Sequence, residues 1–306
     1  MLKKVYFIIS KDNLKIPEVL KSIEEACTYI KECGYVSTYE SIEAVTIEEF
    51  IPNKKTILVV TDKDSFAKKL MNAGVPVVGV SGDFNKDQEF DGLKYVFAEI
   101  DEVDIDSYVK AYQRYVGEPW FILETERLIL RETTLEDVDE FYSLYKDPEM
   151  TQYMEGLFEN PEDEKRYQKD YIDKVYGLMG FGIWTVIRKE DKRIIGRAGF
   201  SVRNGFDEIE LGFLIGKEFQ RKGYAFEACS AIMDYGKNIL LFDKVQTLVK
   251  AENQVSIHIC EKLGFKTIDI VDVEENIYGK EYKTDKNIAL SQAHFGKYVR
   301  MVKFLW

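Results

Sequence analysis

Histidine and cysteine are scarce in this chain of 306 residues, which has two histidines and four cysteines. The cysteines are Cys27, Cys33, Cys229 and Cys260, and the histidines are His258 and His294. Zinc sites and disulfide frameworks need such residues in closely spaced sets, and no Cys-x-x-Cys pair occurs. We therefore expect neither a disulfide framework nor a metal site.

Long apolar runs are also missing. No stretch reaches the roughly 20 apolar residues that a membrane-spanning helix needs. The opening segment, Met1–Ser10, has too short an apolar core for a secretory signal. The sequence thus predicts a cytoplasmic protein without a membrane partner.

Neither half of the chain has an excess of positive charge. Residues 1–119 hold 15 Lys and Arg against 21 Asp and Glu, which leaves 27 against 33 for the rest of a chain with net charge −12. Nucleic-acid binding depends on clustered basic residues, so we expect no nucleic-acid partner. An acidic surface favours a cationic partner such as an amine.

Two domains are expected from the length and from a composition that is 45% hydrophobic and 31% charged. Gly117 and Pro119 interrupt a helical pattern before a new apolar run begins at Trp120, so we place the domains at 1–119 and 120–306. In the first domain, short apolar strands alternate with amphipathic helices such as 17–33. This alternation predicts an α/β fold with a parallel, Rossmann-like sheet.

The most informative stretch is 208–225, which reads as a strand, a tight turn and the start of a helix. A helix start has free backbone N–H groups, and Arg221 and Lys222 add positive charge to it. Gly223 lets backbone approach a ligand closely. The stretch therefore predicts an anion site suited to a pyrophosphate. The chain has neither the P-loop spacing nor a Gly-x-Gly-x-x-Gly segment opening a βαβ unit.

The pattern Gln220-x-x-Gly223-x-Ala225, after a strand with Glu210-Leu-Gly-Phe213, resembles the acetyl-CoA signature of the GNAT superfamily of N-acyltransferases. Downstream, Asn253-x-x-Ser256 followed by Gly264-Phe265 matches the same family. The resemblance covers residues 122–306. It implies an α+β domain with a mixed, mostly antiparallel sheet, and acetyl-CoA as the co-substrate.

The resemblance also implies which residues hold acetyl-CoA. The backbone of Phe213 and Ile215 would bond the pantetheine arm, beside a β-bulge near 211–213 that separates the strand from its neighbour. The remaining cofactor-binding candidates are Gln220, Arg221, Lys222, Gly223, Tyr224, Ala225, Asn253 and Ser256. Asn253 is equally suited to cap the following helix.

Two residues are candidates for catalysis. Glu210 stands in the Glu-Leu-Gly-Phe position and is our candidate general base acting through water, although it could be only a hydrogen-bonded strand carboxylate. Many family members carry a tyrosine acid seven residues after the asparagine. Here that position is Cys260, which is either the acid or a small buried residue.

The segment Thr125–Arg131 resembles the first strand of the RimJ/RimL-type enzymes that acetylate ribosomal-protein N-termini. In that branch, helices between the first two strands line the acceptor pocket. Tyr153, Phe158 and Trp184 are the candidate wall of this pocket, with a place in the core as the alternative. The aromatic tail 276–306 ends in a strand that we expect to close the sheet.

Residues 1–119 resemble a degenerate haloacid-dehalogenase-like (HAD-like) domain through Ile57–Asp62 and Ala73–Gly79. No Asp-x-Asp motif follows the first strand, so we expect no catalysis there. Asp62 and Asp64 are expected to cap the helix near Ser65 rather than to bind magnesium.

Together these features predict an N-acetyltransferase that moves an acetyl group from acetyl-CoA to a primary amine by direct attack. The acceptor is a small molecule or a protein N-terminus. The alternative is a non-catalytic acyl-CoA-binding or regulatory protein whose first domain binds a partner. The sequence leaves the oligomeric state open.

Overall fold

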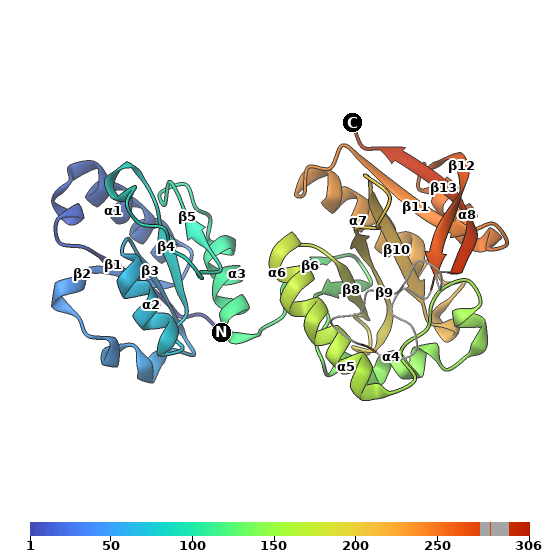
Figure 1. The fold of residues 1–306 in the computed structure, drawn as a ribbon, viewed down its shortest axis with the longest axis horizontal. Helices are drawn as coiled ribbons and strands as arrows, with labels where there is room; N and C mark the ends of the chain where they lie inside the picture. The colour runs from blue at the N-terminus through green and yellow to red at the C-terminus, as the bar shows by residue number, and fades with distance from the viewer. Residues whose placement is uncertain (276–281, 283–293) are drawn as a thin grey trace. The chain divides into compact units, whose positions relative to one another are not determined.

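The chain forms two compact units, Met1–Trp120 and Phe121–Trp306 (Figure 1). The structure is a computed structural model that describes residues 1–275, 282 and 294–306. Trp120 is fastened to the helix before it, because its indole N–H donates to Lys110 O at 2.9 Å and its ring stacks on Arg114. Within the described residues, no helix is long and apolar enough to cross a membrane.

The first unit is built on five parallel strands in the order β2-β1-β3-β4-β5. The strands are β1 (Lys4–Ile9), β2 (Val36–Ser41), β3 (Ile57–Thr61), β4 (Val77–Val80) and β5 (Val96–Phe97), and the helices are α1 (Pro17–Glu32), α2 (Asp64–Asn72) and α3 (Ile105–Val116). Helices α1 and α3 pack on one face of the sheet and α2 on the other. The parallel α/β sheet predicted from the alternation is therefore confirmed.

Strand β2 is absent from the sequence prediction. It lies at the edge of the sheet, beside β1 only, and of its six residues only Ser37 is buried. Such a strand has no apolar alternation to reveal it.

The expected capping role of Asp62 and Asp64 is wrong. Helix α2 begins at Asp64 without a side-chain cap, and Asp64 pairs with Lys68 at 2.7 Å. Asp62 is fully buried and accepts hydrogen bonds from the Ser10 N–H and from Asn13 Nδ2. It turns toward these residues because β1 and β3 are neighbours, so the ends of both strands meet at one edge.

The second unit contains an eight-stranded sheet in the order β12-β13-β11-β10-β9-β8-β7-β6. Its strands are β6 (Phe121–Glu124), β7 (Leu128–Arg131), β8 (Ile183–Arg188), β9 (Ile194–Ser201), β10 (Ile209–Ile215), β11 (Lys244–Lys250), β12 (Lys266–Glu275) and β13 (His294–Phe304). All neighbouring strands run antiparallel except β10 and β11. This mixed, mostly antiparallel sheet confirms the predicted architecture of the unit.

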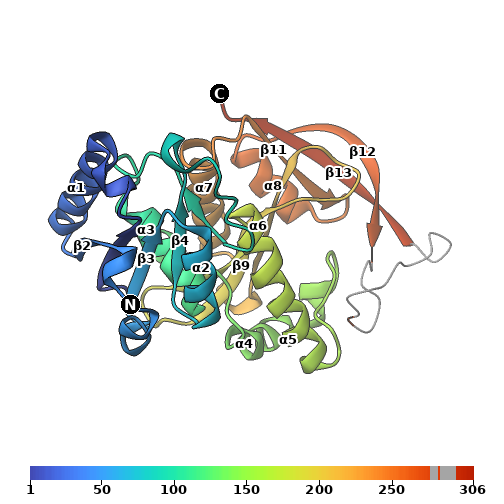
Figure 2. The ribbon, with the colours of Figure 1, turned by 60° about the vertical axis from the view of Figure 1, so that its left-hand side comes forward.

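Helices cover both faces of this sheet. They are α4 (Asp137–Tyr145), α5 (Pro161–Asp170), a π-helical turn η7 (Tyr171–Tyr176), α6 (Gly177–Met179), α7 (Tyr224–Asn238) and α8 (Gln254–Lys262). Figure 2 shows α7 on one side of β9 and the pair α4 and α5 on the other. The core under α7 includes Trp184, whose ring meets Phe200 and Tyr235 edge to face.

Two expectations for this sheet are wrong. The terminal strand does not close the sheet, because β13 lies between β11 and β12 and the edge strand is β12. Strand β12 was not predicted because half of its residues are charged and most of them are exposed. The bulge expected near 211–213 is also absent: β10 pairs with β9 in unbroken register from Glu210 to Ile215. Of the tail before β13, only Tyr282 is among the described residues, and its hydroxyl donates to Asp170 at 2.8 Å.

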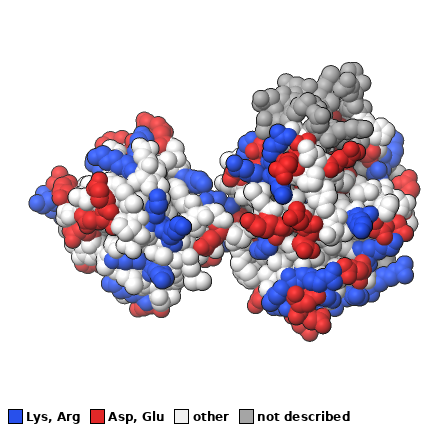
Figure 3. All heavy atoms as spheres, turned by 90° about the horizontal axis from the view of Figure 1, so that it is seen from below, with Lys and Arg blue, Asp and Glu red and all other residues white. Residues whose placement is uncertain are grey.

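Acidic and basic side chains are interspersed on the face of the molecule in Figure 3. Neither sign gathers into one continuous patch on that face.

Candidate functional site

Strands β10 and β11 separate shortly after they begin. Their parallel pairing covers only Ile209 with Val245 and Glu210 with Gln246. One residue further, the Thr247 hydroxyl still donates to Leu211 O at 3.1 Å. Beyond that point β10 is held by β9 alone, so one of its edges is open along the second half of the strand.

Along β10 the backbone groups of successive residues point alternately toward β9 and toward β11, and the hydrogen bonds to β9 show which residues face this opening. Gly216 N–H donates to Ile195 O on β9, so even-numbered residues of β10 point their backbone toward β9. Odd-numbered residues therefore face β11, as the bond to Leu211 O also indicates. Ile215 O is taken by the Gln220 side chain at 2.9 Å. The backbone of Phe213 faces the opening without a strand partner among the described residues.

The segment after β10 leads from this opening to the start of α7. A 3₁₀ turn at Lys217–Phe219 places the Phe219 ring in the interior, where it is 2% exposed. Arg221 and Gly223 then adopt left-handed backbone angles, with φ of 59° and 83°. Such angles are ordinary for glycine and uncommon for arginine, so Arg221 is held there by the turns on either side.

Helix α7 begins directly after Gly223 with no side-chain cap on its first N–H groups. These groups carry the positive end of the helix dipole. Lys217 in the same turn is paired with Asp147 and Glu149, and Lys222 Nζ donates to Glu218 O. Arg221 is exposed and has no acidic partner among the described residues. The start of α7 is therefore an open, positively charged terminus suited to an anion.

Arg127 fixes this terminus from the beginning of β7. Its Nη1 donates to Lys222 O at 3.0 Å, and its guanidinium stacks on the Tyr224 ring at 4.5 Å. It also pairs with Glu227 in the first turn of α7. This role of Arg127 was not predicted from the sequence, where it stands only in a strand segment, because the contact joins segments about 100 residues apart.

Asn253 and Ser256 lie on the opposite side of the opening, after β11. Asn253 caps α8, with its Oδ1 accepting the Ser256 N–H at 3.2 Å. The capping role that the sequence left open is thus observed. Both residues are partly buried at the carboxyl end of β11.

Glu210 lies where β10 and β11 part. It is 6% exposed and pairs with Arg203, with Nε at 2.6 Å from Oε2 and Nη2 at 3.4 Å from Oε1. Burial raises the pKa of Glu210, and the Arg203 guanidinium opposes that rise. Arg203 was not among the residues predicted for the site; it lies two positions before Gly205, and the hairpin between β9 and β10 brings it back toward Glu210.

Cys260 is enclosed in the interior of the unit and has no exposed surface. Burial raises the pKa of its thiol to about 12, against a hydrogen bond with Thr247 that lowers it. A thiol in this setting gives up its proton only with difficulty. Its position is that of a small core residue, the alternative stated for it from the sequence.

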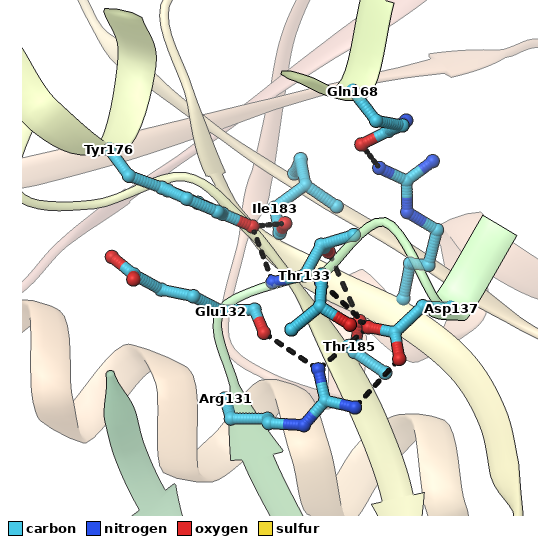
Figure 4. Close-up of polar contacts among 10 residues, drawn as sticks. Arg131, Glu132, Thr133, Asp137, Gln168, Tyr176, Ile183 and Thr185 are labelled. Carbon is cyan, nitrogen blue, oxygen red and sulfur yellow. Dashed lines mark hydrogen bonds and ion pairs between the residues drawn. The ribbon is translucent and has the colours of Figure 1, made fainter. Parts of the chain in front are cut away.

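A buried polar network attaches α4 to the sheet. Figure 4 shows Asp137 between Arg131 of β7 and Thr185 of β8. Asp137 accepts from Arg131 at 2.6 and 2.7 Å, from Thr185 Oγ1 at 2.8 Å and from Thr134 N–H at 3.0 Å. Burial works against the charged carboxylate, yet the Arg131 and Thr134 bonds hold the pKa of Asp137 below its ordinary value.

The π-helical turn presents two tyrosines to the start of β8. Tyr171 OH accepts the Ile183 N–H at 2.8 Å. Tyr176 OH donates to Ile183 O at 2.5 Å, as Figure 4 shows. A side chain at residue 182 would collide with the Tyr176 ring, since a Cβ built there lies 2.5 Å from it. Glycine at this position lets the turn close on the strand. Helical π-turns occur frequently at functional sites.

The three residues expected to form an acceptor wall are not brought together. Phe158 lies beside α5, where its ring meets Tyr167 at 5.8 Å and its N–H donates to Glu164. Tyr153 is half-buried in the preceding segment. Trp184 is fully buried on the opposite face, under α7, so a substrate on the α4 and α5 side does not reach it.

The described residues contain no group of three or more His, Cys, Asp or Glu side chains that could hold a metal ion.

Comparisons with known proteins give the same assignment as the motifs. The family model described as "Acetyltransferase (GNAT) domain" matches residues 127–266. An uncharacterized N-acetyltransferase, p20 of Bacillus licheniformis, is 32% identical over 164 residues, which is 52% of this chain and 89% of that protein.

Two further relatives match shorter stretches. Spermidine N(1)-acetyltransferase of Escherichia coli K12 is 43% identical over 56 residues, or 18% of this chain and 30% of that protein. The ribosomal protein uS5 alanine N-acetyltransferase of the same strain is 33% identical over 95 residues, or 30% of this chain and 45% of that protein. The resemblance to GNAT acyltransferases is therefore confirmed.

Proposed function

The chain belongs to the GNAT family of acetyl-CoA-dependent acyltransferases, and we propose that it acetylates a primary amine at the opening between β10 and β11. The observation that carries the proposal is the unpaired backbone of Phe213 beside the uncapped start of α7. A peptide-like arm can add to the open edge of β10 as a further strand would. A diphosphate suits the N–H groups of α7 together with Arg221.

In this proposal each group has a defined task. Acetyl-CoA supplies the thioester that the amine attacks. The backbone of Phe213 and the N–H of Ile215, whose carbonyl is taken by Gln220, hold the pantetheine arm, and the segment Gln220–Ala225 binds the diphosphate. Asn253 and Ser256 bound the opening from the β11 side.

Glu210 is our proposed base, acting through water. An alkylammonium with a pKa of about 10.4 costs roughly 4–5 kcal/mol to deprotonate at pH 7, so a base increases the amount of reactive amine. A carboxylate with a raised pKa accepts a proton more readily than an exposed one. For the departing thiolate we propose solvent as the proton source, because Cys260 is enclosed and its pKa is about 12.

The acceptor class and the role of the first unit belong to the proposal as well. Two of the relatives named above are named for spermidine and for a ribosomal protein, which supports a small-molecule amine or a protein N-terminus as the acceptor. That the first unit is HAD-like and non-catalytic stays a prediction.

The most direct test of the function is thiol release. Wild-type protein with acetyl-CoA and a panel of primary amines should release free CoA faster than with acetyl-CoA alone, as measured with a thiol reagent. Mass spectrometry should find the acetylated amine. Release that no amine accelerates would instead favour the alternative of a non-catalytic acyl-CoA-binding protein.

Gly223→Val should weaken acetyl-CoA binding severely. The side chain would occupy the approach to the first N–H groups of α7, and a residue with φ of 83° strains any branched side chain. Isothermal calorimetry with acetyl-CoA measures the change.

Gly34→Val is the matched control for this variant. Gly34 has a similar φ of 89°, and nothing lies within 4 Å of a Cβ built there. It carries the same backbone strain in the first unit and should leave acetyl-CoA affinity unchanged. Equal affinity of a folded Gly223→Val protein would reject the site.

The pair Arg203 and Glu210 gives a prediction for pH dependence. Activity needs the Glu210 carboxylate and should fall as the pH drops through its pKa. Arg203→Met removes the charge that lowers this pKa, so the acidic limb of kcat/KM should move to higher pH. A pH series of kcat/KM for the wild type and the variant measures the shift.

Glu210→Gln shows whether the shift of the acidic limb in Arg203→Met comes from Glu210 or from a disturbed structure. It should lower turnover by roughly 10²–10⁴-fold at pH 7 and remove the acidic limb, with little change in acetyl-CoA affinity. In this background Arg203→Met should leave the flat pH profile at low pH unchanged, because no Glu210 carboxylate remains to titrate. Wild-type turnover of Glu210→Gln would exclude Glu210 as the base.

A further inference from the structure

Arg197 lies in the middle of β9, opposite Leu214 of β10. Its side chain is mostly buried on the face that α4 and α5 cover, where its guanidinium stacks on Phe141 of α4 at 4.5 Å. Its Nη2 donates a long hydrogen bond of 3.4 Å to Gln168 Oε1. Its Nε is buried and has no acceptor.

The charge of Arg197 has no acidic partner. Two other arginines on this side of the unit each form a salt bridge: Arg131 with Asp137, and Arg203 with Glu210. No carboxylate oxygen of the described residues lies within 4.0 Å of Arg197. Arg197 is connected to a carboxylate only through Gln168, whose amide N–H donates to the buried Glu164 at 2.8 Å.

The groups in direct contact with Arg197 are uncharged: the Phe141 ring, the Gln168 amide and the hydroxyl of Tyr145, which forms a hydrogen bond with it. The tyrosines Tyr145, Tyr167, Tyr171 and Tyr176 are its main electrostatic neighbours. Two of them come from the π-helical turn, and Figure 4 shows Tyr176 and Gln168 on this side of the sheet. Stacking on Phe141 offsets part of the cost of the buried charge, but an unpaired guanidinium remains expensive to bury.

We propose that Arg197 binds a carboxylate carried by the amine acceptor. The proposal rests on the function proposed above, because it assigns the acceptor to the α4 and α5 side of the opening. A guanidinium binds a carboxylate through two parallel hydrogen bonds, and here Nε still lacks an acceptor. With one cation among neutral neighbours, the site suits a singly charged anion rather than a phosphate.

Two kinds of acceptor carry this chemistry. One is a free amino acid, and the other is a peptide N-terminus with an acidic residue close to it. Both place a carboxylate a few bonds from the amine. A simple amine or a polyamine has no carboxylate to pair with Arg197, and its ammonium group would bring a second positive charge near the guanidinium.

Matched pairs of acceptors test the proposal with the full chain. The pairs are lysine and cadaverine, phenylalanine and phenethylamine, and the peptides Asp-Ala amide and Asn-Ala amide. In at least one pair the wild type should favour the carboxylate-bearing member by about 10- to 100-fold in kcat/KM, the worth of a charge-assisted pair. The first two pairs report on amino acids and the third on peptide N-termini.

Arg197→Met should abolish this preference by lowering kcat/KM for the carboxylate-bearing member only. Arg197→Lys should restore part of it, because lysine keeps the charge and loses the two-pronged geometry. Without ligand, the thermal midpoint of Arg197→Met should equal or exceed that of the wild type, since an unpaired buried charge is removed.

Arg166→Met is the control. Arg166 lies on α5 and pairs with Asp163, so its replacement should leave the preference unchanged. The proposal is overturned if the wild type turns over no carboxylate-bearing acceptor or shows no preference within the pairs. It is also overturned if Arg197→Met lowers both members of a pair equally or lowers the thermal midpoint by several degrees. Failure of the proposed function looks different, because no amine of either kind would then accelerate thiol release.

Discussion

The one parallel pair in an otherwise antiparallel sheet is the constraint on which the site depends. Because β10 and β11 run in the same direction, the segments that follow them leave the sheet at the same edge. One segment becomes the start of α7 and the other the Asn253 cap of α8. The early separation of the two strands then leaves an open strand edge that leads toward two helix starts.

The opening is kept by side chains that lie far from it in sequence. Arg127 holds the loop before α7 through Lys222 O and Glu227, about 100 residues away. Within the loop, the buried Phe219 ring anchors the turn from inside. On the other face, the Asp137 network ties α4 to two strands. The backbone that would meet acetyl-CoA is therefore positioned by contacts that make no use of a ligand.

Two partly buried arginines, Arg197 and Arg203, determine the charge on the proposed acceptor side. Arg203 forms an ion pair with Glu210, which fixes the position of the proposed base. Burial raises the pKa of Glu210 and the Arg203 charge lowers it. Arg197 has no such partner, which makes it the arginine on this side with bonding capacity left for a substrate. An acceptor that carries both an amine and a carboxylate uses both features.

Sequence reasoning succeeded where the signal is local. The turn and helix start at 216–225, the cap at Asn253 and most strands follow from neighbouring residues, and the structure has them. It failed for β2, an exposed edge strand without apolar alternation, and for β12, an exposed edge strand in which half of the residues are charged. It also failed for Trp184, since an aromatic residue on a strand does not reveal which face is the core. Arg127, Arg197 and Arg203 were missed because their partners are set by tertiary structure.

Hydrogen exchange with and without acetyl-CoA tests the central claim most directly. Mass spectrometry of the full chain should find slower exchange in peptides that contain the Phe213 amide and the first turn of α7, with the first unit as an internal reference. Protection should be weaker in β8, whose edges are already paired with β7 and β9. Saturating acetyl-CoA that leaves β10 and the start of α7 unprotected would contradict the account.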